Sequence, residues 1–254
     1  MPPLSKEQAV QEKAYEFPYH YMDLASNYHK IMSNGYLDLL NVVKEFILSS
    51  NKNKILEVGC GDGRLCYEIK NSGLEIVGVD YSERAINFAK LFNPNIKFYI
   101  QNIENLDLNE KFDIIICMEI LEHFIPKKIP NILSNISKVL KKDGKLIITV
   151  PTKNLPLSKK HYQHFTPKSL AKTLKPYFEI EEIKGYEKRG IKKLIYNFLR
   201  VITCGLLPFN TKFISIENKL ISLLRNYYKK NLSIDRPEKC NGLIAECIKY
   251  GTKI

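Results

Sequence analysis

Several features that would place this chain in particular classes of protein are missing from its sequence. None of its apolar runs approaches the ~20 residues that cross a bilayer, so we expect no transmembrane helix. Residues 1–7 contain no apolar signal-peptide core, so we expect no export. The six cysteines form no Cys-x-x-Cys pair. We therefore expect reduced thiols in a cytoplasmic protein.

Arginine is scarce for a chain of this charge. The 254 residues include only six arginines, and lysine raises the net charge to +12 at pH 7. The charge is concentrated in residues 187–230, where ten basic and two acidic residues give +8. That segment therefore needs an explanation of its own.

Strand-like and helix-like segments alternate along the chain, whose length suits one large α/β domain or one domain with an insertion. Amphipathic spacing predicts helices at residues 37–48, 65–70, 83–91 and 130–141. Apolar, β-branched runs predict strands at residues 55–58, 74–80, 96–100, 112–118 and 145–150, with later ones at 178–183 and 243–250. The alternation predicts a mainly parallel, doubly wound sheet.

Three glycines follow the first of these strands at alternate positions. Without a Cβ, Gly59, Gly61 and Gly63 let the backbone approach a ligand, and the helix behind them begins with free N–H groups. A dinucleotide-binding loop would have its third glycine where Arg64 stands, which weakens the case for a nicotinamide cofactor. Asp80 ends the second strand, where a carboxylate can accept hydrogen bonds from ribose hydroxyls.

Together these motifs resemble the class I S-adenosylmethionine-dependent methyltransferases, over about residues 50–185 plus the final strand. The matching segments are Glu57-x-Gly59-Cys60-Gly61-x-Gly63, Asp80, Met118–His123, Gly144–Leu146 and His161–Pro167. The resemblance implies a Rossmann-like, seven-stranded, mostly parallel sheet with an antiparallel last strand. The apolar spacing of residues 37–48 and of the basic segment adds N-terminal helices and a helical insertion before that strand. The run Cys117–His123 is similar to the O-methyltransferases of ubiquinone biosynthesis.

The same resemblance implies how S-adenosyl-L-methionine is held. Glu57 and the backbone of Gly59, Cys60 and Gly61 would hold its methionine end, and Asp80 its ribose. The remaining contacts would be Tyr81, Asn102 and Ile103 at the adenine, and Cys117 and Met118 at the sulfonium.

Catalysis needs a base if an alcohol or phenol is methylated. The candidate is His123 with Glu122 beside it, and the alternative is that both only brace the following loop. With Glu119 they could ligate a divalent ion, as the ubiquinone-biosynthesis resemblance suggests. Many metal-independent relatives carry a similar Glu-His pair, so we expect no metal.

Two other segments are candidates for the acceptor side of the site. The aromatic patch at residues 17–21, with Tyr19 and Tyr21, forms either a lid or simple packing of the N-terminal helix on the sheet. His161 and His164 either face the acceptor or anchor their own loop.

The basic segment has a helical hairpin pattern, with Ile191, Leu194, Ile195, Phe198, Leu199 and Ile202 on one face. Three interpretations remain open. It is a substrate-covering cap whose apolar faces pack on the core, an amphipathic anchor on an anionic membrane, or a nucleic-acid surface. The scarcity of arginine weakens the third.

We therefore expect four segments: an N-terminal helical lid (1–50), a methyltransferase core (51–186), a basic helical insertion or cap (187–240) and the last core strand (241–254). The expected function is O-methylation of a small-molecule, sugar or lipid-linked acceptor by a cytoplasmic enzyme, peripheral at the inner membrane face if the hairpin is an anchor. The alternatives are an RNA methyltransferase and a non-catalytic S-adenosylmethionine-binding protein. The sequence predicts no oligomeric state.

Overall fold

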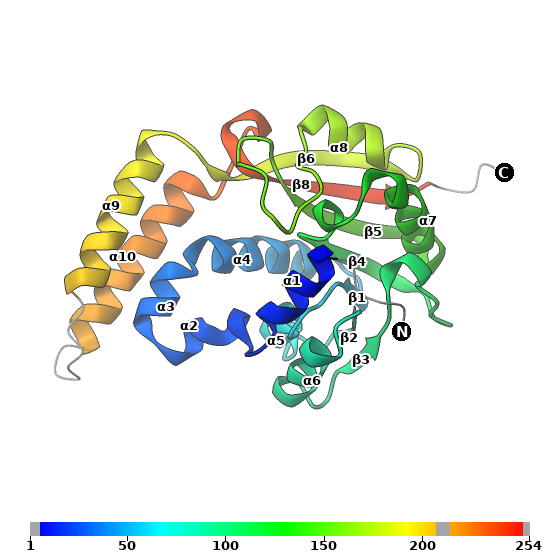
Figure 1. Cartoon of the computed structure of the whole chain (residues 1–254), viewed down its shortest axis with the longest axis horizontal. Coiled ribbons are helices and arrows are strands. Elements are labelled where there is room, and N and C mark those ends of the chain that lie inside the picture. The colour runs from blue at the N-terminus through cyan, green and yellow to red at the C-terminus, as the bar shows by residue number, and fades with distance from the viewer. Residues whose placement is uncertain (1–5, 207–213, 251–254) are drawn as a thin grey trace.

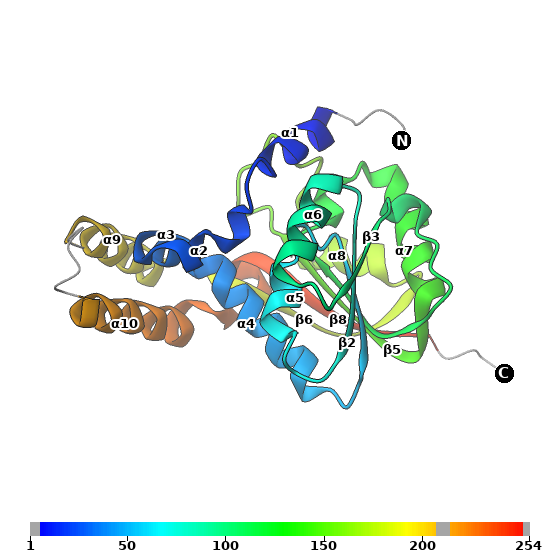
Figure 2. The ribbon, with the colours of Figure 1, turned by 90° about the horizontal axis from the view of Figure 1, so that it is seen from below.

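A single twisted sheet with helices on both faces forms the centre of the molecule (Figures 1 and 2). The computed structural model describes residues 6–206 and 214–250. Within these residues, no helix is both long enough and apolar enough to cross a membrane. The ends of expected segments 1–50 and 241–254 lie partly outside the described residues.

The sheet has eight strands in the order β3-β2-β1-β4-β5-β8-β6-β7. Strands β1 to β5 pair in parallel, whereas β8 runs antiparallel between β5 and β6. The predicted doubly wound sheet with an antiparallel last strand is confirmed. The count is eight rather than seven because the short β7 pairs with the edge of β6. The strands are β1 Lys54–Val58, β2 Glu75–Asp80, β3 Lys97–Ile100, β4 Phe112–Met118, β5 Leu140–Pro151, β6 Phe178–Lys188, β7 Ile234–Asp235 and β8 Cys240–Lys249.

Each face of the sheet buries its own apolar core. On one face lie α4 (Asn34–Ser49), α5 (Arg64–Ile69) and α6 (Glu83–Phe92), and on the other α7 (Ile129–Val139) and α8 (Pro167–Leu174). Helix α8 was not predicted, although the sequence carries start signals for it. Thr166 and Ser169 form a reciprocal capping box, and Pro167 is the first residue of the helix. Five cysteines, Cys60, Cys66, Cys117, Cys240 and Cys247, are free and buried among the described residues.

A smaller helical lobe stands beside the sheet (Figure 1). It combines the N-terminal α2 (Met22–Ala25) and α3 (Asn27–Met32) with the hairpin α9 (Ile191–Leu206) and α10 (Ile214–Leu232). Its own core consists of Ile31, Tyr196, Ile221, Leu224, Tyr228 and Leu232. The N-terminal helices, which begin with α1 (Lys6–Ala14), and the helical insertion before the last strand are as predicted.

Candidate active site

A cavity of about 350 Å³ opens where β1, β2 and β4 end. Parallel strands bring their carboxyl ends to one edge of a sheet, so segments distant in sequence meet there. The glycine loop after β1, Asp80 at the end of β2 and Met118 at the end of β4 form its floor. Its outer walls come from the N-terminal segment and from the loop around His161.

The glycine loop folds tightly against both the sheet and the cavity. The N–H groups of Gly59 and Cys60 both donate to the Val79 carbonyl, at 2.7 and 3.0 Å. Gly59 and Gly61 have φ values of +71° and +52°, which favour glycine. A Cβ at Gly59 would overlap the Ile120 side chain, which lines the cavity. Glycine is therefore needed here for both conformation and space.

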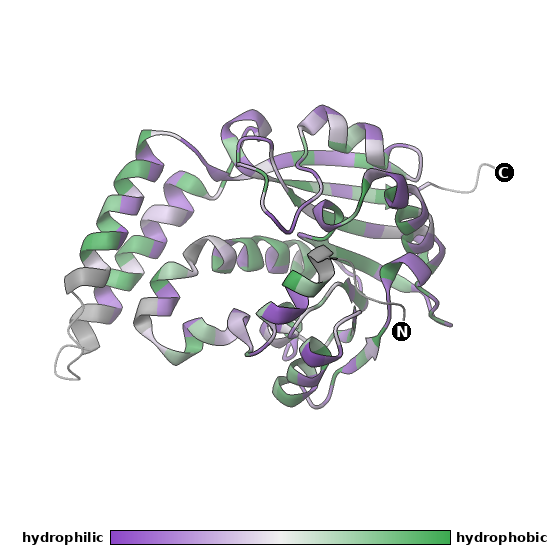
Figure 3. Cartoon of the chain, viewed as in Figure 1, coloured by the Kyte–Doolittle hydropathy of each residue, from purple (hydrophilic) through white to green (hydrophobic). Residues whose placement is uncertain are grey.

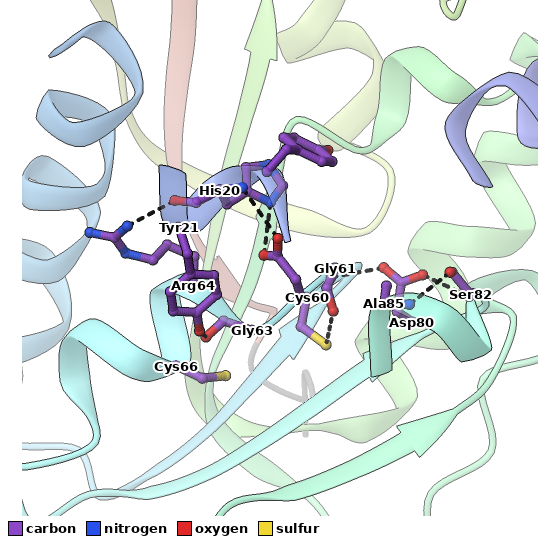
Figure 4. A network of polar contacts seen from close by, with 12 residues as sticks. His20, Tyr21, Cys60, Gly61, Gly63, Arg64, Cys66, Asp80, Ser82 and Ala85 are labelled. Atoms are coloured by element: carbon purple, nitrogen blue, oxygen red, sulfur yellow. Dashed lines mark hydrogen bonds and ion pairs between the residues drawn. The ribbon is translucent and has the colours of Figure 1, made fainter. Parts of the chain in front are cut away.

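Asp80 shapes this loop as well as facing the cavity (Figure 4). Its Oδ2 accepts from the Gly61 N–H and its Oδ1 from the Ser82 N–H, both at 2.9 Å. Burial raises the pKa of the carboxyl to about 6, against the effect of these hydrogen bonds. The Tyr81 backbone also acts on this carboxyl, and the acceptor capacity that these N–H groups leave can take a ligand hydroxyl.

Glu57 is a buried carboxyl of the cavity floor, one residue before the end of β1. The Cys66 thiol donates to its Oε2 at 3.0 Å. Burial raises the pKa of Glu57 to about 8. A ligand ammonium placed beside it would favour the ionised form, so the cavity offers a site for a cationic group at this point.

The N-terminal segment closes the cavity with aromatic rings, those of Tyr15, Tyr19, His20 and Tyr36. The His20 ring stacks on Tyr36, with 4.9 Å between the centroids. Its Nδ1 lies 2.8 Å from Oδ1 of Asp62, a fully buried residue of the glycine loop. Sequence reasoning missed Asp62, although a charged residue between loop glycines could have signalled such an anchor.

Arg64 is a second anchor of the N-terminal segment that sequence reasoning missed. Its guanidinium is almost fully buried, pairs with Asp23 and Glu68, and donates to the His20 carbonyl at 2.8 Å. Arg64 stands where a dinucleotide-binding loop would have its third glycine, and it ties the N-terminal segment to the glycine loop. A buried arginine with two carboxylate partners fixes this geometry strongly.

Most of the predicted cofactor and acceptor residues line the cavity. Cys117 does not, because alternation along β4 points its side chain into the core beneath α7. Tyr21 does not line it either: its hydroxyl donates to the Gly63 carbonyl at 3.1 Å and its ring stacks on Phe92. The predicted residues that line the cavity are Glu57, Gly59, Cys60, Gly61, Asp80, Tyr81, Asn102, Ile103, Met118, Tyr19, His123 and His161.

The turn after β4 carries two carboxyl groups, Glu119, which is half-buried, and Glu122, which is buried. Glu119 has a left-handed backbone (φ 55°), and its carboxylate accepts from the hydroxyls of Thr149 and Tyr186 at 3.0 and 2.7 Å. Glu122 is fully buried, and within the described structure neither of its oxygens has a hydrogen-bond partner. Burial removes water from the Glu122 carboxyl and raises its pKa well above the usual value.

His123 lies next to Glu122 and lines the cavity. Its Nδ1 is 3.0 Å from the Lys160 carbonyl. A carbonyl only accepts, so Nδ1 carries the proton and Nε2 presents its lone pair, 3.8 Å from Glu122 Oε1. Burial lowers the pKa of the imidazole, which keeps it neutral.

The loop carrying His161 is held against this turn, because the Tyr162 N–H donates to the Glu122 carbonyl at 2.8 Å. The His161 ring meets His123 edge-on, with 4.8 Å between the centroids. His161 Nδ1 is 2.8 Å from His164 Nε2, and His164 Nδ1 is 3.2 Å from the Leu155 carbonyl. This chain of donors leaves the lone pair on His161 Nε2. His161 lines the cavity and His164 does not, so His164 stands behind His161.

Three of these side chains could also hold a metal ion. Glu122, His123 and His161 each offer a ligand atom, and these atoms lie within 4.8 Å of one another. One carboxylate and two imidazoles suit a divalent transition-metal ion. The sequence pointed to Glu119 with Glu122 and His123 and predicted no metal, because metal-independent relatives carry a similar Glu-His pair. The structure groups His161, not Glu119, with the other two.

Known proteins match this chain in sequence. A family model described as a methyltransferase domain matches residues 49–197. The ubiquinone biosynthesis O-methyltransferase of Pelagibacter ubique is 35% identical over 124 residues, which are 45% of this chain and 51% of that protein. The enzyme of the same name from Coxiella burnetii is 35% identical over 120 residues, 45% and 50% of the two chains. The chain thus spans about half the length of these curated relatives.

Solved structures share the fold at low sequence identity. Magnesium protoporphyrin IX methyltransferase of Synechocystis, solved with bound S-adenosylmethionine, aligns with a TM-score of 0.59 at 16% identity, over 98% of this chain and all of that one. The PH0226 protein of Pyrococcus horikoshii aligns with a TM-score of 0.56 at 17% identity, over 85% and 91%. The family match covers more than half of the chain and includes the glycine loop, Asp80 and the turn at His123. The chain belongs to the class I S-adenosylmethionine-dependent methyltransferases.

Proposed function

We propose that this protein transfers the methyl group of S-adenosylmethionine to a hydroxyl oxygen of a small-molecule or lipid-linked acceptor. The main support is the neutral His123, whose Nε2 lone pair lies in the wall of the same cavity as the glycine loop, Glu57 and Asp80. The names of the curated relatives, which are O-methyltransferases, favour oxygen as the acceptor atom.

The cavity floor fits this cofactor from end to end. Glu57 is a buried carboxyl available to the ammonium of the methionine part, beside a loop where only glycine leaves room. Asp80 keeps acceptor positions for the ribose hydroxyls. Tyr81, Asn102 and Ile103 lie along the wall for the adenine, and Met118 lies at the end of β4 for the sulfonium. The bound cofactor supplies an electrophilic methyl group.

The acceptor side then has to position a hydroxyl and remove its proton. His123 Nε2 would take that proton, because Nδ1 is already committed to the Lys160 carbonyl. The cofactor would supply the methyl group and leave as S-adenosylhomocysteine when its sulfur–methyl bond breaks. His161 presents a second nitrogen lone pair beside it and would orient the acceptor. Tyr19, His20 and Tyr36 form an aromatic wall that suits a flat or apolar acceptor and excludes water.

The unpartnered Glu122 carboxyl favours a second route to the same reaction. A divalent cation on Glu122, His123 and His161 would lower the pKa of an acceptor hydroxyl without a protein base. Chelation separates the two routes. Full activity in EDTA supports the base, whereas activity that EDTA removes and Mg²⁺, Mn²⁺ or Zn²⁺ restores supports the cation.

The proposal is tested in two steps on the purified full chain. Calorimetry measures the binding of S-adenosylhomocysteine, and a radiolabelled methyl assay measures turnover on phenolic, sugar and lipid-extract acceptors. We expect His123→Ala to bind S-adenosylhomocysteine like the wild type and to lose about 10²- to 10⁴-fold in turnover.

Lys127→Ala, an exposed change on the same connection beyond His123, is the control and should change neither quantity. A wild-type chain that does not bind S-adenosylhomocysteine would contradict the cofactor assignment. A His123→Ala variant with unchanged turnover would contradict the assigned base.

A further inference from the structure

Helix α9 presents a continuous apolar face to solvent. Residues spaced three and four apart fall on one side of a helix. The apolar residues of α9, green in Figure 3, recur at this spacing and form a stripe along the helix. All seven members of this α9 stripe are large and between 37% and 69% exposed: Ile191, Leu194, Ile195, Phe198, Leu199, Val201 and Ile202. Sequence analysis left open a cap whose apolar faces pack on the core, but this face of α9 does not pack on it.

The opposite side of α9 is what holds the helix to the protein. Tyr196 is 1% exposed and belongs to the lobe core with Ile31, Ile221 and Tyr228. Lys193 pairs with Glu187 near the start of the helix at 2.5 Å. The helix is therefore anchored through this side, and no residue of the α9 stripe belongs to the lobe core. An apolar face of this extent on a well-anchored helix is typical of an interaction surface.

The charge around the stripe restricts what can cover it. Residues 187–230 hold ten basic and two acidic residues, and one of the two acidic residues, Glu187, is already paired with Lys193. Exposed basic side chains of this segment are Arg189, Lys192, Lys219, Lys229 and Lys230. Two copies of such a surface repel each other, whereas an anionic surface attracts it.

We propose that the α9 stripe inserts into the interface of an anionic phospholipid bilayer, with the exposed basic residues Arg189, Lys192, Lys219 and Lys230 on the lipid head groups. An interfacial helix needs a wide apolar face, nearby cationic side chains and no capacity to span, and α9 meets all three conditions. The helix would lie in the membrane plane while α10 and α3 connect it to the catalytic sheet. This proposal does not depend on which atom the enzyme methylates.

Vesicle flotation of the full chain provides the test. The vesicles are phosphatidylcholine alone, or an equal mixture of phosphatidylcholine and phosphatidylglycerol, in low salt and in about 0.5 M salt. We expect flotation with the anionic vesicles, little flotation with the neutral ones, and partial loss in high salt. Salt screens the lysines but not the buried apolar side chains.

Two kinds of variant separate the stripe from general charge attraction. Leu194→Ser with Phe198→Ser should lower the partition coefficient on anionic vesicles at least about tenfold, because two large side chains lose their burial. Leu91→Ser is the matched control, since Leu91 on α6 is 71% exposed but far from the hairpin, and it should partition like the wild type. Lys219→Glu with Lys230→Glu should weaken binding and reduce its salt dependence.

Three results would overturn the proposal. The first is that the wild type fails to float with anionic vesicles in low salt. The second is that the stripe variant floats as well as the wild type, which would leave only charge attraction. The third is that the wild type does not bind vesicles and instead self-associates through the stripe in sedimentation velocity, which would make the stripe an interface between copies. Circular dichroism and S-adenosylhomocysteine binding of each variant show that the fold and the cofactor site are intact, so a failure here is separate from one of the proposed function.

Discussion

The floor and the outer wall of the cavity are built in different ways. The floor comes from residues 57–103 and the end of β4, where the backbone and single carboxyl groups act at the ends of adjacent strands. The wall comes from residues 15–36 and 160–162, which reach the cavity only through long-range contacts. The floor thus needs a local chain pattern, whereas the wall needs the whole fold. Mutations should separate the two regions.

The largest effect is expected at Arg64, which joins the two regions. Arg64→Ala removes the partner of buried Asp23 and the hydrogen bond to the His20 carbonyl. Breaking a buried ion pair leaves an uncompensated charge, so we expect the free energy of unfolding to fall by about 3–5 kcal/mol. Urea denaturation followed by circular dichroism measures it. Arg84→Ala, at a 60% exposed arginine whose nearest carboxylate is 3.9 Å away, is the control and should change little.

Arg64 also shows where sequence reasoning stopped. The strands, the glycine loop and Asp80 could be predicted because each follows from a local period or spacing. The aromatic wall could not be assigned, because Tyr19 reaches the cavity while Tyr21, two residues away, packs on Phe92. Which of the two faces the ligand depends on contacts with Asp62 and Arg64, more than 40 residues along the chain. Likewise, no spacing rule brings His161 against His123.

The next largest effect is expected on the floor, at Asp80. Asp80→Ala removes the acceptor that we propose for ribose hydroxyls and the acceptor for the N–H groups of Gly61 and Ser82. Charge-assisted hydrogen bonds of this kind are each worth about 1.5–3 kcal/mol, so S-adenosylhomocysteine affinity should fall about 100-fold. Calorimetry measures it, with the exposed Asp107→Ala as control. An unchanged dissociation constant would remove Asp80 from the cofactor site.

A smaller effect on the floor is a proton released at Glu57. Burial raises the pKa of Glu57 to about 8, so at pH 7 the free protein holds this carboxyl mostly protonated. A ligand ammonium beside it lowers that pKa and expels the proton, so affinity for S-adenosylhomocysteine should rise as the pH rises from about 6 to about 8. Calorimetry in two buffers of different ionisation enthalpy should give a release of up to ~1 proton at pH 7.

Glu57→Gln is the matched variant and should bind without that release. The stability of the free protein changes with pH in the opposite direction to the affinity for the ligand. A folded pKa raised above the ordinary value of 4.5 means that the unfolded chain ionises first, so Glu57 lowers stability as pH rises from 4.5 towards 8. Buffer-independent binding enthalpies in the wild type would show that no ammonium lies beside Glu57.

The smallest effect is expected at the wall, where His164 acts only through His161. His164→Ala removes the acceptor of the His161 Nδ1 proton, and nothing in the cavity floor changes. S-adenosylhomocysteine affinity should stay within about twofold and turnover should fall about fivefold, since one neutral hydrogen bond is worth about 1 kcal/mol. Nitrogen-15 spectra of the imidazoles report the tautomer directly: the wild type should show His161 protonated at Nδ1, and the variant a mixture. If His161 showed the same tautomer in both, the hydrogen bond to His164 would not be what orients it. The backbone contact between Tyr162 and Glu122 would then be sufficient to hold the wall.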